Sequence, residues 1–125
     1  SLCAPIFELA EVFNPNAVKV VRDAMGYALY FSRAPIPWDR DAFPVKAGSG
    51  QGEHFRHIGI YSYTAGFLRR YITWPVCALE QIESLEQLRI LYQGERIIVP
   101  AVEKVPEAGV DTQADLDRIN ALLSV

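Results

Sequence analysis

Two short apolar runs that favour β-strands lie only three residues apart in this chain. They are residues 17–23 (AVKVVRD) and residues 27–33 (YALYFSR), and the connecting residues AMG include Gly26, which suits the backbone angles of a tight turn. Lys19 and Arg22 lie among valines, so we expect a partly buried hairpin. Whatever else the chain forms, its sheet should therefore contain an antiparallel part.

Strand-like and helix-like segments alternate in the second half of the chain. Pro75 and Gly94 are typical of helix ends, and Asp111 or Thr112 can cap the last helix. The expected elements are a strand at 57–64, a helix at 65–74, a long helix at 79–94, a short strand at 96–102 and a helix from 112 to about 123. Together with the hairpin, this order predicts an α/β fold with a mixed sheet.

Size and charge limit the classes of function. The chain has 125 residues, of which 50% are hydrophobic, so it is one domain or a piece of one and can bury a core. Its net charge of −3 gives no footprint for nucleic acid or an anionic membrane, and no apolar run reaches the ~18 residues of a membrane span. Cys3 and Cys77 match no metal or redox spacing and are expected to be free thiols, and the first residues have no basic leader. We therefore expect a cytoplasmic protein.

Residues 34–56 are the least regular part of the sequence and contain several prolines and glycines. A loop of this length in a compact domain is usually functional, disordered or packed on a partner. The glycines at 48–52 neither follow a predicted strand nor precede a predicted helix, so they are interpreted as a flexible loop. No other segment has the glycine-rich strand-to-helix pattern that cradles phosphates.

The strand expected at 57–64 carries several polar rings. Residues two apart in a strand share a face, so His57, Gly59, Tyr61 and Tyr63 should point the same way. Their imidazole and phenol groups could hydrogen-bond a polyhydroxylated or carboxylated ligand, with Gly59 leaving space for it. A half-exposed sheet face would explain the same pattern, and the residues alone leave both readings open.

The long helix expected at 79–94 should have two different faces. Glu83, Glu86 and Gln87 follow the i, i+3, i+4 spacing of one polar stripe, which is either solvated or part of a site. The buried side is expected to consist of Leu79, Ile82, Leu85 and Leu88.

Arg33 stands at the end of the second hairpin strand, directly before Ala34-Pro35. A residue before proline stays extended, and ligands of α/β folds bind at the ends of strands. Arg33 could therefore fork onto a carboxylate or phosphate of a ligand. The alternative is a pairing with a carboxylate of the protein, such as Asp39 or Asp41.

Five motifs together resemble one known family. NPNAVKVV, GYALYFSRAPIPWDRD, HIGIYSYTAGFLRRY, LEQIESLEQLRIL and AGVDTQADLDRI occur in the order and spacing of the C-terminal half of 3-deoxy-manno-octulosonate (KDO) cytidylyltransferases. The resemblance runs from about Asn14 to Leu123. It implies a nucleotide-diphospho-sugar transferase (Rossmann-like) fold and transfer of a cytidylyl group from CTP to KDO, giving CMP-KDO and pyrophosphate for lipopolysaccharide biosynthesis. Members of the family are cytoplasmic, Mg²⁺-dependent homodimers.

The resemblance also implies roles for particular residues. Asp111, which a helix cap alone would explain, would be a catalytic ligand of Mg²⁺. Residues 34–56 would contribute dimer contacts. The residues implied to line the KDO pocket are Arg33, His57, Tyr61, Glu86 and Gln87.

The family's CTP-binding loop has no counterpart here, because residues 1–125 match only the C-terminal half. We therefore expect a fragment of a chain of ~250 residues, a usual size for a complete α/β unit, that is not active alone. Two alternatives remain open at this stage. The chain could come from another sugar-acid cytidylyltransferase, such as one acting on sialic acid, or be a non-catalytic sugar-binding or dimerisation module.

Overall fold

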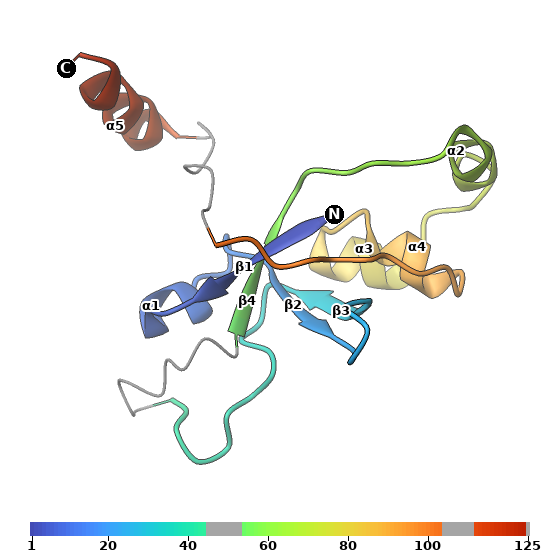
Figure 1. Ribbon diagram of the computed structural model, residues 1–125, viewed down its shortest axis with the longest axis horizontal. Helices are drawn as coiled ribbons and strands as arrows, with labels where there is room; N and C mark the ends of the chain where they lie inside the picture. Colours follow the sequence, from blue (N-terminus) through green and yellow to red (C-terminus); the bar gives the residue numbers. More distant parts are fainter. Residues whose placement is uncertain (45–53, 104–111, 125) are drawn as a thin grey trace.

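The computed structural model describes residues 1–44, 54–103 and 112–124, and a four-stranded sheet lies at its centre (Figure 1). The strands follow the order β1-β4-β2-β3, and each neighbouring pair is antiparallel. The elements are β1 (Leu2–Ile6), α1 (Leu9–Val12), β2 (Lys19–Arg22), β3 (Ala28–Ser32), β4 (His54–Ile58), α2 (Ala65–Tyr71), α3 (Ala78–Glu83), α4 (Leu88–Tyr92) and α5 (Gln113–Leu123).

The predicted hairpin is confirmed as β2 and β3. Its turn is closed by Asp23, whose Oδ1 accepts the backbone N–H groups of Met25 (2.8 Å) and Tyr27 (2.9 Å). Gly26 has φ +88°, which an L side chain rarely adopts. Lys19 is completely buried and donates from Nζ to the carbonyl of Asn14 at 2.8 Å, which satisfies its polar end within the sheet.

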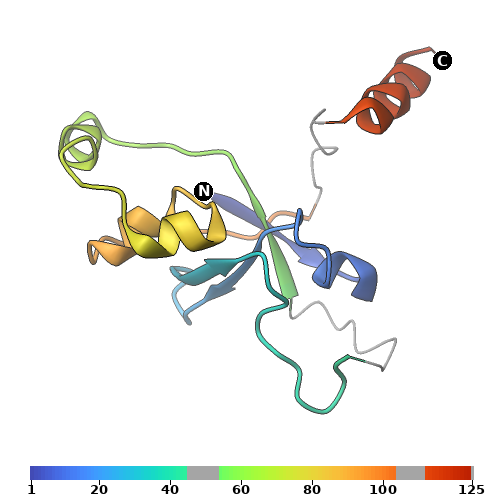
Figure 2. The same cartoon turned by 180° about the vertical axis from the view of Figure 1, so that it is seen from behind.

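The strand expected at 57–64 lies earlier in the chain. Strand β4 covers His54–Ile58 and pairs with both β1 and β2, with Arg56 opposite Ala4 on one side and Lys19 on the other. In the described part of the chain no strand pairs with the residues after Ile58, so residues 59–64 leave the sheet as an extended arm that leads to α2 (Figure 2). Residues 54–56 of the excursion expected at 34–56 belong to β4, and the dimer contacts expected for the excursion stay a prediction.

The long helix expected at 79–94 is divided in two. Ser84 adopts the left-handed conformation (φ 52°, ψ 49°), which ends α3 and separates it from α4. Leu85 and Leu88 are buried as expected, whereas Leu79 and Ile82 are 37% and 79% exposed, so the predicted apolar face is wrong for α3. The break allows α3 to turn a different side to the core, and that side carries Glu80.

The strand expected at 96–102 is reduced to isolated bridges. Ile98 forms an antiparallel bridge with Tyr27, and Ala101 forms a parallel bridge with Cys3. The backbone N–H of Cys3 donates to the Pro100 carbonyl (3.0 Å), and the Cys3 carbonyl accepts the backbone N–H of Val102 (2.8 Å). The α/β class is therefore confirmed, although among the described residues this single bridge is the parallel contribution to an otherwise antiparallel sheet.

The main core lies between the sheet and α4, and a smaller cluster of Ile6, Val12, Ala42 and Phe43 packs around α1. Cys3 and Cys77 are buried free thiols, as predicted. The buried residues of the main core are Cys3, Val20, Ala28, Phe31, Leu85, Leu88, Ile90, Ile97 and Val99.

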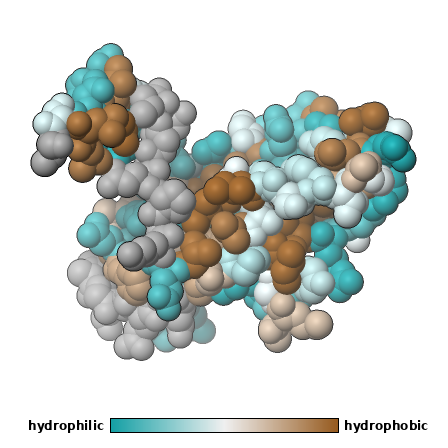
Figure 3. All heavy atoms as spheres, turned by 45° about the horizontal axis from the view of Figure 1, so that its top comes forward, coloured by the Kyte–Doolittle hydropathy of each residue, from teal (hydrophilic) through white to brown (hydrophobic). Residues whose placement is uncertain are grey.

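Helices α2 and α5 extend away from the sheet (Figures 1 and 2). Thr64 caps α2 by accepting the N–H of Phe67 at 3.1 Å, and Thr112 caps α5 by accepting the N–H of Asp115 at 3.2 Å. Figure 3 shows apolar side chains exposed on α5, where Leu123 is 78% exposed. Within the described residues, every helix is too short or too polar to cross a membrane.

Candidate functional site

A row of aromatic rings follows the arm from β4 to α2. His57 and Tyr61 have ring centroids 5.5 Å apart, Tyr61 stacks on Tyr63 at 5.7 Å, and Tyr63 stacks on Phe67 at 5.3 Å. Both stacked pairs are within 3° of parallel, and at these centroid distances the rings are offset. The expectation that His57, Tyr61 and Tyr63 lie together is met by ring stacking along an irregular arm and not by strand alternation.

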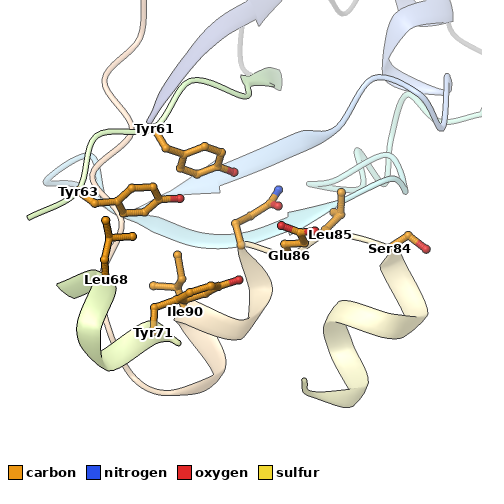
Figure 4. Close-up of a pocket in the computed structure, with 9 residues that line it drawn as sticks. Tyr61, Tyr63, Leu68, Tyr71, Ser84, Leu85, Glu86 and Ile90 are labelled. Carbon is orange, nitrogen blue, oxygen red and sulfur yellow. The ribbon is translucent and has the colours of Figure 1, made fainter. Parts of the chain in front are cut away.

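A cavity of about 440 Å³ lies between this arm, α2 and the break between α3 and α4. Figure 4 shows Tyr61, Tyr63 and Tyr71 with their hydroxyl groups pointing to the same side, toward Glu86. The phenols thus approach the polar residues of the α3–α4 break across a space large enough for a sugar. The residues that line the cavity are Tyr61, Tyr63, Leu68, Tyr71, Ser84, Leu85, Glu86, Gln87 and Ile90.

Gln87 is the most enclosed polar side chain of the cavity lining. It is 8% exposed and lines the cavity. A carboxamide offers two N–H donors and an oxygen acceptor. Gln87 therefore has both kinds of hydrogen bond available for a ligand, beside the exposed carboxylate of Glu86.

The rings of the arm are neutral at pH 7. Burial, with a smaller contribution from the amino group of Ser1, lowers the pKa of His57 to about 4, and its Nε2 lies 2.7 Å from the Ser1 hydroxyl. Burial also raises the pKa of Tyr61, with Tyr63 and Glu86 adding to the shift, so the phenol stays protonated. His57 therefore acts as a neutral hydrogen-bonding group. Among the described residues that line the cavity, Glu86 is the only charged one.

Arg33 lies behind the α3–α4 break and does not line the cavity. Its guanidinium donates to the carbonyls of Glu83 (Nε, 2.8 Å), Pro15 (2.9 Å) and Ser84 (3.3 Å). Neither Asp39 nor Asp41 is its partner among these contacts, contrary to one of the two expectations. The assignment of Arg33 to a ligand stays a prediction.

Glu83 is held on the same side of the break. Its carboxylate accepts the Ser32 hydroxyl at 2.5 Å and the backbone N–H of Arg33 at 2.9 Å. Glu83 thus faces the end of β3, while Glu86 and Gln87 face the cavity. The polar stripe predicted for a single straight helix is therefore divided between two different sites.

A buried ion pair between Glu80 and Arg89 lies beside Tyr71 of the cavity wall. Glu80, 7% exposed, accepts from Nε of Arg89 at 2.7 Å and from the backbone N–H of Cys77 at 3.3 Å, and these contacts hold the pKa of its carboxyl below the usual range. The Arg89 guanidinium lies 4.9 Å from the centre of the Tyr71 ring. Sequence reasoning missed Tyr71 and Ser84; the helix predicted at 65–74 could have indicated Tyr71, because it follows Phe67 by four residues and so shares its face.

A second cavity of about 270 Å³ lies nearby and shares Tyr61 and Tyr63 with the first. Two arginines line it: Arg70, which pairs with Glu95 at 3.1 Å, and Arg96, whose guanidinium lies 4.5 Å from the centre of the Tyr27 ring. Both cations thus already have partners within the chain.

The predicted magnesium ligand, Asp111, lies outside the described residues. Within the described ranges, no three His, Cys, Asp or Glu side chains come close enough together to hold a metal ion. The role of Asp111 stays a prediction from the sequence.

Residues 1–97 match the family model described as cytidylyltransferase. The chain belongs to the cytidylyltransferase family.

Its relatives place it more narrowly. The chain is 61% identical over 125 residues to the 3-deoxy-manno-octulosonate cytidylyltransferase of Aeromonas hydrophila subsp. hydrophila, covering 99% of this chain and 49% of the relative. It is 57% identical over 123 residues to the enzyme of the same name from Erwinia tasmaniensis, covering 98% and 50%. The chain therefore spans about half the length of these curated relatives, and the resemblance seen in the sequence motifs is confirmed.

A solved structure agrees with this placement. CMP:2-keto-3-deoxy-manno-octonic acid synthetase complexed with CTP superposes on the chain with a TM-score of 0.86 and 39% sequence identity. The match covers 99% of this chain and 48% of that protein. The predicted fold is thus confirmed at the level of the cytidylyltransferase fold.

Proposed function

We propose that this chain forms the sugar-acid-binding half of a 3-deoxy-manno-octulosonate cytidylyltransferase. The observation that carries the proposal is the cavity of about 440 Å³, in which phenols from the arm face Glu86 and Gln87 from the α3–α4 break. The complete protein would have a nucleotide-diphospho-sugar transferase (Rossmann-like) fold with a mixed sheet. Its CTP-binding half would lie outside residues 1–125.

The cavity suits a ligand with many hydroxyl groups. Tyr61 and Tyr63 are protonated at neutral pH and can both donate and accept, Gln87 can do the same, and Glu86 can accept. These residues would bind and orient the sugar acid so that one of its hydroxyl oxygens attacks the α-phosphorus of CTP while pyrophosphate leaves. Fixing that geometry is a large part of what such a transfer requires.

The negative charge of the sugar acid needs a balancing cation from outside the described cavity lining. His57 is neutral at pH 7 and cannot offset a carboxylate by charge, and Glu86 is itself an anion. We therefore assign His57 to hydrogen bonding beside the cavity. The sequence-based assignment of Arg33 to the carboxylate has a competing explanation in its contacts with the α3–α4 break.

We extend the proposal to the metal ion, the oligomeric state and the cellular compartment of the complete enzyme. Mg²⁺, held in part by Asp111, would supply a hard cation that neutralises phosphate oxygens when bound. The protein would be a cytoplasmic homodimer with dimer contacts in the 34–56 excursion, and the two free thiols are compatible with a reducing compartment. Neither nucleic acid nor a membrane is an expected partner.

The test is pyrophosphate release by the full-length gene product that contains this chain, with CTP and Mg²⁺ and with KDO, sialic acid or no sugar. Release that requires KDO supports the proposal. Release with sialic acid alone would assign another sugar acid, and no release with either sugar would leave a binding or dimerisation module.

A second measurement ties the activity to this cavity. Tyr61→Phe removes one hydroxyl and should raise the KDO concentration for half-maximal rate about tenfold, because one ligand hydrogen bond is lost. Tyr92→Phe is the matched control, since Tyr92 is 61% exposed and outside the cavity lining. Equal behaviour of the two variants would move the sugar site elsewhere.

A further inference from the structure

We propose that Tyr71 is a specificity-determining residue of the cavity: its hydroxyl donates to one hydroxyl group of the sugar acid, and that group donates in turn to the Glu86 carboxylate. The proposal rests on the function proposed above and concerns the same site. It adds a residue of α2 to the groups from the arm and from the α3–α4 break.

The direction of the Tyr71 side chain gives the first argument. Tyr71 lines the cavity, and its hydroxyl points to the same side as those of Tyr61 and Tyr63, toward Glu86 (Figure 4). Burial raises the pKa of Tyr71, and although Arg89 opposes this shift, the phenol stays protonated at neutral pH. A phenol can donate and a carboxylate can only accept, so the two groups match the two sides of a hydroxyl group placed between them.

The surroundings of the Tyr71 ring give the second argument. The Arg89 guanidinium lies 4.9 Å from the centre of the ring. The ring centroids of Phe67 and Trp74 lie 6.1 Å and 6.0 Å away. Arg89 is itself held by Glu80, which accepts from its Nε at 2.7 Å. The phenol is therefore fixed before a ligand arrives, and a fixed group loses less conformational freedom on binding than a mobile one.

The charges beside the cavity give the third argument. Arg89 and Glu80 form a pair whose side chains are 16% and 8% exposed, so this pair offers no free cation to a carboxylate ligand. Glu86, the charged residue of the described lining, repels the carboxylate of a sugar acid but accepts hydrogen bonds from its hydroxyl groups. The wall made by Tyr71 and Glu86 should therefore face the hydroxylated part of the sugar acid.

A single conservative variant separates the hydroxyl from the ring. The Tyr71 ring also packs against the main core, and Tyr71→Phe keeps this packing while it removes the hydroxyl. In the full-length gene product, Tyr71→Phe should raise the half-saturating KDO concentration about tenfold and leave that of CTP unchanged. Tyr92→Phe, at an exposed tyrosine outside the cavity lining, is the matched control and should behave as the wild type.

Analogues of KDO that each lack one hydroxyl group test whether Tyr71 contacts the sugar. One analogue should bind at least about tenfold more weakly than KDO to the wild-type protein, but no more weakly than KDO to Tyr71→Phe, because the hydrogen bond is already missing there. Glu86→Ala should reduce the discrimination against the same analogue, and Tyr92→Phe should retain it.

A merely structural role of Tyr71 predicts a different pattern. It would weaken the binding of KDO and of every analogue by the same factor, so that Tyr71→Phe would discriminate among them as the wild type does. That result would overturn the proposal. Tyr71→Phe and Glu86→Ala that lose discrimination at two different hydroxyl groups would also overturn it, because the two residues would then not share one group.

The two proposals fail in different ways. If pyrophosphate release by the wild-type protein does not require KDO, the proposed function fails, and the role of Tyr71 in binding KDO fails with it. If release requires KDO but Tyr71→Phe has the half-saturating KDO concentration of the wild type, the proposed function stands and the role of Tyr71 alone is overturned.

Discussion

His57 should make the stability of the chain depend on pH in a range where most other groups do not titrate. The imidazole packs against Phe31, with ring centroids 4.8 Å apart, and burial lowers its pKa to about 4. In the unfolded chain the pKa of histidine is about 6.5. Between these two values the unfolded state binds a proton that the folded state does not, so stability is present above about pH 6.5 and is lost as the pH falls toward 4.

The size of the effect follows from the two pKa values. At pH 5 the unfolded chain carries the proton on His57 almost completely, while the folded protein remains about nine-tenths neutral. The free energy of unfolding should therefore be about 2 kcal/mol lower at pH 5 than at pH 7. Glu80, whose pKa is lowered by Arg89, contributes stability above its unfolded pKa and loses it only at more acidic pH.

Urea unfolding at pH 7 and pH 5, followed by far-ultraviolet circular dichroism, measures this difference. His57→Gln should remove most of the pH dependence, whereas His54→Gln, at the other histidine of the chain, should retain it. His54 differs in that its Nε2 hydrogen-bonds to the Pro37 carbonyl at an exposed position. A loss of about 2 kcal/mol that survives in His57→Gln would refute the assignment to the buried imidazole.

Two further predictions concern groups outside the arm. Arg89→Met should lower the free energy of unfolding, because it leaves the Glu80 carboxylate without its cation, and the loss in a urea titration should exceed that of Arg118→Met on α5, whose salt bridge to Asp115 is more exposed. Asp111→Asn in the full-length gene product should lower turnover about 10²-fold or more while the protein stays folded; near-normal turnover with unchanged Mg²⁺ dependence would return Asp111 to the role of a helix cap.

The sequence predicted the elements whose signals are local. Gly26 and the flanking valines identified the hairpin, and Thr112 with Asp115 identified the start of α5, whereas α2 ends at Tyr71, earlier than Pro75 indicated. Each depends on a turn or cap that neighbouring residues determine by themselves.

The elements that the sequence misplaced depend on contacts with distant residues. At the division of the 79–94 helix, the Glu83 carbonyl accepts from Arg33, about fifty residues earlier, and Glu80 pairs with Arg89 of the following helix. A local sign existed, since Ser84 followed by Gln87 has the spacing of a helix-starting capping box, but the strong helical propensity of the segment conceals it.

The candidate site was predicted only in part, because it is formed by separate segments of the chain. Tyr61, Glu86 and Gln87 line one cavity, whereas His57 lies beside it and Arg33 behind it. Spacing within one segment can indicate which side chains share a face. It cannot show that a strand ends at Ile58 or that an arginine is used by backbone carbonyls, because those facts depend on the packing of separate segments.

The bridge between Cys3 and the segment around Ala101 also constrains the order in which the chain can fold. The β2–β3 hairpin joins near neighbours and can form as soon as its residues are available. By contrast, β1 must wait for β4, and its hydrogen bonds with Pro100 and Val102 close a loop of nearly the whole described chain. Sheet completion should therefore be a late and slow event: β1 can pair with β4 only after residue 58 has been made, and its hydrogen bonds with Pro100 and Val102 form only after residues near position 102 have left the ribosome.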